Sequence, residues 1–255
     1  MKILLLGGIN EAKKLAGQLH RLGHQVTYSV AGLVRQPFLE CPVISGGFSQ
    51  YCENEQPSSD SSGIEGLISW LGQQAIELVI DATHPYAEQI SKHAVIASDR
   101  LGLPCWRYQR PAWQSSYEMP FDEVANWHSL SFTLPHYRRP LFAVGQIPPE
   151  RLHIAEHQQW LVRSAVPISH RHPRLTTITA IGPFSIAHEE QMLRLHRADL
   201  LIAKNSGGST MNNKLAAANR LNIPVTLLQR PRLKSADREF SDLESLISAL
   251  PNRVC

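Results

Sequence analysis

The stretch LLIAKNSGG, residues 200–208, places a lysine and two glycines directly after an apolar run. The glycines allow a tight turn, and successive backbone N–H groups in such a turn form a concavity that binds anions. Lys204 can pair with a carboxylate of a ligand or, where burial lowers its pKa, donate a proton. A lysine that only extends from a strand end to solvent is the bland alternative. We predict that Lys204 binds substrate electrostatically, with proton donation as its second role.

A second polar cluster, DATHP at residues 81–85, follows another apolar run. Pro85 suits the start of a helix, because its missing N–H has no partner within a helix. We therefore expect Thr83 or His84 to cap that helix. For Asp81 and His84, capping and ligand contact both remain open.

The elements that position these clusters follow an alternating pattern. Apolar strand runs are predicted at residues 2–8, 24–32, 41–48, 76–85 and 103–111, with helices at 10–23, 63–75 and 86–102. Strand runs resume at 140–146, 158–166, 176–184, 198–208 and 223–231. Such alternation indicates parallel sheets covered by helices on both faces.

The alternation breaks between residues 112 and 139, which divides the chain into two α/β halves with a crevice between them. We predict a first domain at residues 1–115, a connection at 116–139 and a second domain at 140–255. Residues 53–63, ENEQPSSDSSG, are expected to be a polar, disordered insertion in a surface loop.

Composition limits the possible functions. The 255 residues are 43% hydrophobic and 18% charged, with four cysteines that show no CxxC spacing. The first apolar run, residues 3–6, is too short for a signal peptide, and no run approaches the ~20 residues that span a membrane. We expect a cytoplasmic protein, with a monomer as the working assumption. The net charge of +3 comes from scattered arginines, which suit an anionic small molecule better than a nucleic acid.

The predicted strand ends are rich in glycine and small polar residues, as expected where backbone approaches a phosphate or a flat ring. The first turn, residues 7–12, is GGINEA and lacks the GxGxxG fingerprint of dinucleotide-binding proteins. The second strand ends without the acidic residue that binds the ribose of NAD. It offers Ser29 and Arg35, which suit a 2'-phosphate, so NADPH is favoured, while NADH remains open.

The chain resembles the precorrin-6A reductases of corrin-ring (vitamin B12) synthesis. The matching pieces run in order along nearly the whole chain: LGGINEAKKLA (6–16), SVAG (29–32), GGF (46–48), DATHPYA (81–87), RPAW (110–113), GPF (182–184), KNSGG (204–208) and RP (230–231). DATHP and KNSGG together are the specific part. The resemblance implies two Rossmann-like three-layer domains and NAD(P)H-dependent reduction of one carbon–carbon double bond in a polycarboxylate macrocycle, precorrin-6A or its cobalt form, to precorrin-6B.

The sequence departs from the family pattern at four positions. Ile9 replaces a threonine, and Leu33, Gln146 and Ile181 replace arginines expected to help bind anions. Arg35, Arg139 and Arg163 are candidate substitutes. These losses keep a second class open, a protein that binds a tetrapyrrole or nucleotide without turning it over.

These arguments assign residues to two ligands. We predict cofactor contacts at Gly7, Gly8, Glu11, Ser29, Gly32, Arg35, Gly46, Gly47 and Thr83. We predict substrate contacts at Asp81, His84, Arg110, Gly182, Lys204, Ser206, Gly207 and Gly208, with Lys204 as the catalytic residue. No metal is expected: His153 and His157 are spaced by four on a predicted helix, but no third ligand lies at a recognisable spacing.

Overall fold

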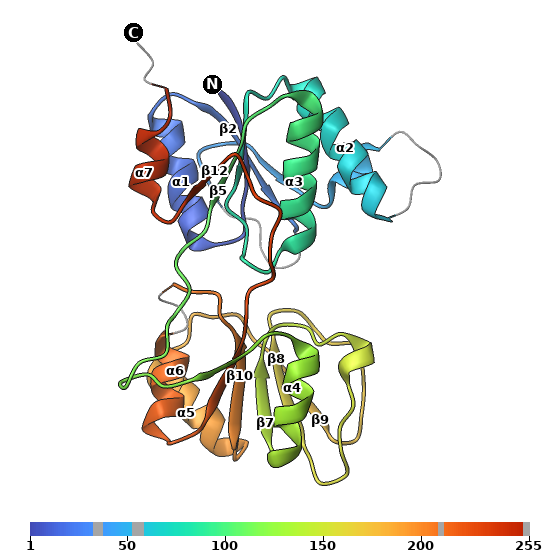
Figure 1. Ribbon diagram of the computed structural model, residues 1–255, viewed down its shortest axis with the longest axis vertical. Helices are drawn as coiled ribbons and strands as arrows, with labels where there is room; N and C mark the ends of the chain where they lie inside the picture. Colours follow the sequence, from blue (N-terminus) through green and yellow to red (C-terminus); the bar gives the residue numbers. More distant parts are fainter. Residues whose placement is uncertain (33–37, 53–58, 209–211, 252–255) are drawn as a thin grey trace. The chain divides into compact units, whose positions relative to one another are not determined.

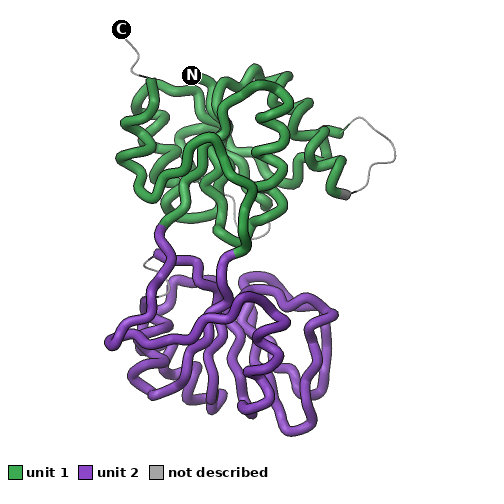
Figure 2. Tube along the Cα trace, viewed as in Figure 1, with its two compact units in different colours: residues 1–110, 231–255 green, residues 111–230 purple. Residues whose placement is uncertain are grey.

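The computed structural model describes residues 1–32, 38–52, 59–208 and 212–251. The chain forms two compact units, residues 1–110 with 231–255, and residues 111–230 (Figure 2). Each unit contains one six-stranded sheet, and the described strand pairs all run parallel. The predicted α/β class with two Rossmann-like domains is confirmed. Within the described ranges, no helix has the length and apolarity needed to cross a membrane.

The sheet of the first unit has the strand order β12-β5-β4-β1-β2-β3. Its strands are β1 (Lys2–Leu6), β2 (Gln25–Val30), β3 (Val43–Ser45), β4 (Leu78–Asp81), β5 (Cys105–Tyr108) and β12 (Arg238–Phe240). The order reverses at β1, which pairs with β2 on one side and β4 on the other. Parallel sheets bind ligands at the carboxyl ends of the strands beside such a reversal. A site is therefore expected at the ends of β1, β2 and β4.

Alternate residues of β1 face two different helical layers. Ile3 and Leu5 pack with α1 (Asn10–Arg21) and α7 (Leu243–Ser248), whereas Leu4 and Leu6 pack with α2 (Ser59–Gln74) and α3 (Glu88–Leu101). Figure 1 shows α1 and α7 together on one face of the sheet and α2 and α3 on the other. Because both faces are buried, the strand is apolar from Ile3 to Leu6 instead of alternating with polar residues.

The sheet of the second unit has the order β6-β11-β10-β7-β8-β9. Its strands are β6 (Asp122–Val124), β7 (Pro140–Ala143), β8 (Trp160–Ser164), β9 (Leu175–Thr179), β10 (Leu200–Lys204) and β11 (Val225–Leu228). Its helices are α4 (Trp127–Thr133), α5 (Ile186–Leu195) and α6 (Asn212–Arg220), and short 3-10 turns lie at Leu134–His136 and Pro149–Arg151. A third such turn, Phe48–Tyr51, belongs to the first unit. Leu201 and Ala203 pack with α5 and α6, while Phe142 stacks on Trp127 of α4.

The two units of the structure divide the chain at other residues than the predicted domains, because each sheet contains one strand that the sequence pattern did not indicate. Five strands of each sheet have the same order. The sixth strand, at one edge, comes from outside the alternating strand–helix pattern: β6 precedes β7 in the second sheet, and β12 follows β11 in the chain and joins the first sheet. Residues 116–139 therefore belong to the second unit, and residues 231–255 to the first. Strands β6 and β12 have only three residues each and are largely exposed, so the sequence shows no apolar run there.

The chain crosses between the units at two equivalent places, each reading Gln-Arg-Pro, at residues 109–111 and 229–231. The backbone N–H of Gln109 donates to the Phe240 carbonyl at the end of β12 (2.8 Å). In the same way Gln229 donates to Val124 at the end of β6 (2.9 Å). Each crossing is thus fixed to the edge strand of the sheet it leaves.

The expected insertion at residues 53–63 is only partly a loop. Residues 53–58 lie outside the described part, but α2 begins at Ser59, so residues 59–63 are helical. The polar composition that predicted disorder there belongs to the first turn of a helix, where Ser and Asp are favourable.

Candidate functional site

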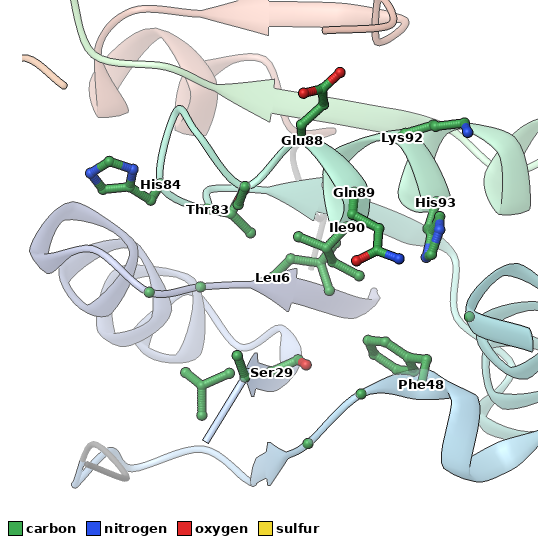
Figure 3. Close-up of a pocket in the computed structure, with 18 of the residues that line it drawn as sticks. Leu6, Ser29, Phe48, Thr83, His84, Glu88, Gln89, Ile90, Lys92 and His93 are labelled. Atoms are coloured by element: carbon green, nitrogen blue, oxygen red, sulfur yellow. The ribbon is translucent and has the colours of Figure 1, made fainter. Parts of the chain in front are cut away.

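A cavity of about 890 Å³ lies in the first unit, at the carboxyl ends of β1, β2, β3 and β4 (Figure 3). The volume falls within the range of about 300–1,000 Å³ that is common for small-molecule sites. Seven residues assigned from the sequence line it: Gly7, Gly8, Ser29, Gly46, Gly47, Thr83 and His84. Figure 3 shows Gln89 and Ile90 of α3 pointing toward Leu6 and Phe48, while Glu88 points away.

Gly7 and Gly8 line the cavity, but their backbone N–H groups already have partners within the protein. The N–H of Gly7 donates to the Ser29 carbonyl (2.8 Å), and that of Gly8 donates to the Tyr28 hydroxyl (3.1 Å). A Cβ at Gly7 would overlap the Tyr28 ring, whereas a Cβ at Gly8 would meet no atom within 4 Å. Gly7 is therefore small because a ring packs on it, and Gly8 leaves room for a ligand beside the backbone. Burial raises the pKa of Tyr28, which keeps its hydroxyl neutral.

The start of α1 follows Gly8 directly and has no side-chain cap. Its N-cap residue is Ile9, with extended backbone and no side-chain hydrogen bond to the first turn. The first N–H groups of a helix have no helical partners, and together with the helix dipole they attract anions. The Ile9 side chain has no acceptor that could compete with a ligand phosphate for these N–H groups.

The turns after β2 and β3 need glycine for their backbone conformation. Gly46 has φ +102° and its N–H donates to the Val30 carbonyl (3.1 Å), and Gly32 has φ +76°. Gly46 and Gly47 line the cavity, but Gly32 is not among its lining residues. Arg35, the residue predicted to bind a 2'-phosphate, lies outside the described residues.

Asp81 does not line the cavity, but it holds Thr83, which does. The side chain is 2% exposed and accepts hydrogen bonds from Arg107 Nε (3.0 Å) and from the hydroxyl of Thr83 (2.7 Å). Its substrate-binding assignment is therefore not supported by its position. Asp81 instead fixes Thr83, whose side chain also contacts the Ser91 hydroxyl (3.3 Å).

The predicted capping role of Thr83 or His84 is wrong. Helix α3 begins at Glu88 after the N-cap residue Ala87, and no side chain caps it. Pro85 lies in the turn before the helix, where His84 Nδ1 accepts a hydrogen bond from the Tyr86 N–H (3.3 Å). The chain needs these extra residues to turn from β4 into α3, which leaves Thr83 and His84 facing the cavity.

Three charged or polar cavity residues were missed by the sequence reading. Asp60 of α2 accepts hydrogen bonds from Lys92 Nζ and His93 Nε2 of α3, both at 2.8 Å. The bond from His93, followed by that from Lys92, lowers the pKa of Asp60 to about 2. Because Asp60 falls in the stretch read as a disordered loop, nothing in the sequence indicated that it meets α3.

Glu11 and Arg110 were assigned to different ligands but form one ion pair. Arg110 Nη1 lies 3.1 Å from each carboxylate oxygen of Glu11. Arg110 is the arginine of the first Gln-Arg-Pro crossing, so the pair ties the end of β5 to the first turn of α1. Neither residue lines the cavity.

In the second unit, Lys204 is the last residue of β10 and is half-buried. Burial lowers the pKa of Lys204, as the sequence argument required for a proton donor. Ser206, two residues after Lys204, is 6% exposed, and its N–H donates to the Lys204 carbonyl (2.7 Å). The turn thus holds Lys204 at the carboxyl end of the sheet, where ligands bind parallel sheets.

Asn205 and Gly207 of this turn have structural partners. The Asn205 side chain accepts from the Trp113 N–H (2.9 Å) and donates to the Trp113 carbonyl (3.0 Å). A Cβ at Gly207 would overlap the Pro111 carbonyl oxygen. The RPAW and KNSGG motifs are therefore packed against each other. Gly208 has φ +81°, as a tight turn needs.

The GPF motif follows β9 and precedes α5. A Cβ on Gly182 would lie 3.3 Å from the Phe184 ring, and the Phe184 ring covers the Arg163 guanidinium at 4.5 Å. Arg163, one of the candidate substitutes for the lost arginines, forms a buried pair with Glu189 at 3.0 Å. Arg139, another candidate, donates through Nε to the His196 carbonyl (2.7 Å).

His153 and His157 do not lie on a helix, contrary to the sequence prediction; they fall in irregular chain and a turn. Only a short 3-10 turn, Pro149–Arg151, precedes them in the chain. In the ranges that the structure describes, no three metal-binding side chains come together.

The sequence model of one protein family, described as "Precorrin-6x reductase CbiJ/CobK", matches residues 2–251. The chain belongs to this precorrin-6x reductase family. Curated relatives cover nearly the whole chain. The "Precorrin-6A reductase" of Rhodococcus erythropolis is 32% identical over 251 residues, covering 97% of this chain and 96% of the relative. That of Mycobacterium tuberculosis (strain H37Rv) is 33% identical over 266 residues and covers 99% of each.

A "Cobalt-precorrin-6A reductase" of Salmonella typhimurium is 25% identical over 245 residues, covering 90% of this chain and 87% of the relative. Among solved structures, "CobK precorrin-6A reductase" superposes with a TM-score of 0.81 at 29% identity and covers 97% of this chain and 95% of that one. The fold is therefore that of this reductase family.

The residues present fit a nicotinamide dinucleotide. The space in front of Gly8 is open, the start of α1 has no side-chain cap, and glycines border the cavity at the ends of β1 and β3. These features provide close backbone approach and an anion-binding helix start, as dinucleotide phosphates require.

Proposed function

We propose that this protein reduces one ring double bond of precorrin-6A or its cobalt form, giving the corresponding precorrin-6B, with NADPH as reductant. The supporting observation is the glycine-bordered cavity at the carboxyl ends of β1 to β4, in a chain of the precorrin-6x reductase family. Both the precorrin and the cobalt-precorrin relatives match, so both substrates belong in the test.

When bound, the nicotinamide supplies a hydride for one ring carbon. The chain must then orient two flat molecules, exclude water and provide a proton for the neighbouring carbon. Gly8 and the start of α1 are proposed to hold the dinucleotide backbone, with Thr83 and His84 at the cavity wall. Lys204 is proposed to bind a carboxylate arm of the substrate and, second, to hold the proton.

Purified protein is incubated anaerobically with precorrin-6A or its cobalt form and with NADPH or NADH. We expect loss of the absorbance of the reduced nicotinamide and a product heavier by two hydrogen atoms. Binding of the tetrapyrrole without either signal would identify a non-catalytic binder. Absence of both binding and turnover with either substrate would contradict the proposal.

Gly8→Ala is expected to weaken NADPH binding about 10-fold or more, because the new methyl group occupies the space beside the cavity backbone. The φ of +137° also strains any other residue, at about 1–3 kcal/mol of folding free energy. The dissociation constant comes from fluorescence titration, and stability from thermal unfolding. Gly102→Ala is the control: it has φ +63° and nothing within 4 Å, but it does not line the cavity. Equal NADPH affinity in the two variants would place the cofactor elsewhere.

Arg35→Ala is expected to raise the Michaelis constant for NADPH while sparing NADH. The expectation rests on the sequence, in which Leu33 replaces the arginine of the family pattern and Arg35 is the nearest cation. A guanidinium forms charge-assisted hydrogen bonds with the 2'-phosphate of NADPH, and it cannot form them with the neutral 2'-hydroxyl of NADH. Steady-state kinetics with each nicotinamide measure the ratio. An equal change for both cofactors would show that Arg35 does not read the 2'-phosphate.

A further inference from the structure

One part of the cavity in the first unit has apolar walls. Leu6 at the end of β1 and Phe48 after β3 line it, and both are at most 5% exposed. Ile90 of α3 also lines it, and Figure 3 shows its side chain pointing toward these two residues. The Phe48 ring packs edge-on against the Trp70 ring of α2, with 5.8 Å between the ring centroids. An aromatic ring held in this way offers a fixed surface to a flat ligand.

His93 of α3 lines the same cavity and is held by α2. Its Nε2 lies 2.8 Å from Asp60 Oδ1, and its side chain is 6% exposed. A Cβ at Gly63 would overlap the imidazole ring, so α2 also packs directly on it. These contacts tie the first turn of α2 to α3, and the residues of α3 that face the cavity are therefore fixed in position before a ligand binds.

Gln89 is the uncharged polar residue of α3 that points into this apolar part of the cavity (Figure 3). It lies in the first turn of α3, four residues before His93, so the two side chains share one face of the helix. In the ranges that the structure describes, no hydrogen bond holds its side-chain amide. A primary amide offers an acceptor oxygen beside a donor nitrogen. The complementary ligand group is a flat ring whose edge has a donor beside an acceptor.

Adenine has this edge. Its N6 amino group donates beside the acceptor N7, and a glutamine amide can bind both atoms at once. The position also suits the adenosine half of a dinucleotide. Dinucleotide-binding sheets hold the adenosine ribose at the end of the second strand. In this sheet β3 is the strand beyond β2, and Phe48 follows β3 closely.

We propose that Gln89 binds the adenine ring of the nicotinamide cofactor, with the ring against Phe48. The proposal rests on the proposed function, which makes the ligand of this cavity NADPH. It assigns a residue to recognition of the base. Gly8 and the start of α1 are proposed to hold the dinucleotide backbone, and Arg35 the 2'-phosphate, so these roles are separate.

The wild-type protein tests the contact with an analogue of NADPH in which purine replaces adenine, so that only the N6 amino group is missing. We expect the analogue to bind about 10-fold more weakly than NADPH, because the Gln89 oxygen loses its donor. Fluorescence titration measures both dissociation constants. Equal values for the two cofactors would overturn the proposal, whatever the behaviour of the variants.

Gln89→Ala assigns the effect to the amide. Its dissociation constant for NADPH should rise about 10-fold, whereas that for the purine analogue should change by no more than about 3-fold, because the analogue already lacks the main contact. Gln73→Ala is the matched control and should change neither value, since Gln73 is an exposed glutamine of α2 that does not line the cavity. An equal loss for both cofactors in Gln89→Ala would show that the amide does not recognise adenine.

A second analogue separates adenine from nicotinamide. In the 3-acetylpyridine form of NADPH a methyl ketone replaces the carboxamide, and the adenine is unchanged. We expect Gln89→Ala to weaken binding of this analogue about 10-fold, as it does for NADPH. A weakening that disappears with this analogue but persists with the purine analogue would place the nicotinamide, and not the adenine, against Gln89.

The outcomes separate this proposal from the function on which it rests. A wild-type protein that binds NADPH but does not reduce either form of precorrin-6A would contradict the proposed reaction, and the titrations would still decide the role of Gln89. An active wild type whose NADPH affinity is unchanged in Gln89→Ala would contradict only the adenine contact. A wild type that does not bind NADPH would contradict both.

Discussion

Lys204→Met should reduce the turnover number for precorrin-6A about 100-fold, the usual loss for one positioned acid or electrostatic donor. The amine lies at the carboxyl end of β10, and burial lowers its pKa, so it can act both as a charge and as an acid. NADPH affinity should remain nearly intact, since the cavity proposed for the cofactor is lined by residues between 6 and 93. Steady-state kinetics and a separate NADPH titration measure the two effects.

Lys204→Arg separates the two roles. Arginine restores the charge but does not release its proton, so recovered turnover indicates electrostatic binding, and continued failure indicates acid catalysis. An acid must be protonated to act, so in the second case wild-type turnover falls as pH rises through the lowered pKa of Lys204. Arg220→Met controls for loss of a cation from the second unit. Full activity in Lys204→Met would exclude both roles.

The fold was predictable where burial leaves a strong pattern in the sequence. Strands β1, β4 and β10 are covered on both faces and therefore read as unbroken apolar runs. The edge strands β6 and β12 have three residues each and are stabilised by backbone pairing to β11 and β5. Backbone pairing does not depend on the type of side chain, so the sequence pattern did not indicate these two strands or the domain boundaries that depend on them.

For the site, the sequence predicted positions better than roles. Gly7 and Gly207 were assigned to ligands because they follow strands, yet each has a neighbour that excludes a Cβ, the Tyr28 ring and the Pro111 carbonyl. The lowered pKa of Lys214 was also not predicted, because it is caused first by burial and then by the charge of Arg163, which is far away in the sequence. Long-range contacts of this kind become visible only in the folded chain.

Asp81→Ala should lower the free energy of unfolding by about 3–5 kcal/mol, the range for breaking a buried ion pair by removing one partner. Asp81 and Arg107 are 2% and 3% exposed, and their 3.0 Å pair joins β4 to β5. Without the carboxylate, the Arg107 guanidinium keeps the Lys234 carbonyl (2.8 Å) and Glu239 (3.1 Å), but its Nε loses its partner. Urea unfolding of wild type and variant measures the difference.

Glu239→Gln is the matched control, because Glu239 contacts the same guanidinium but is half-exposed, and such pairs contribute about 0–1 kcal/mol. Asp81→Asn tests the earlier assignment of Asp81 to the substrate: it removes the charge but keeps an oxygen for the Thr83 hydroxyl. Since the Asp81 carboxylate is buried against Arg107 and the Thr83 hydroxyl, the folded Asp81→Asn protein should keep the wild-type Michaelis constant for precorrin-6A. A stable variant with a raised Michaelis constant would return Asp81 to the substrate site.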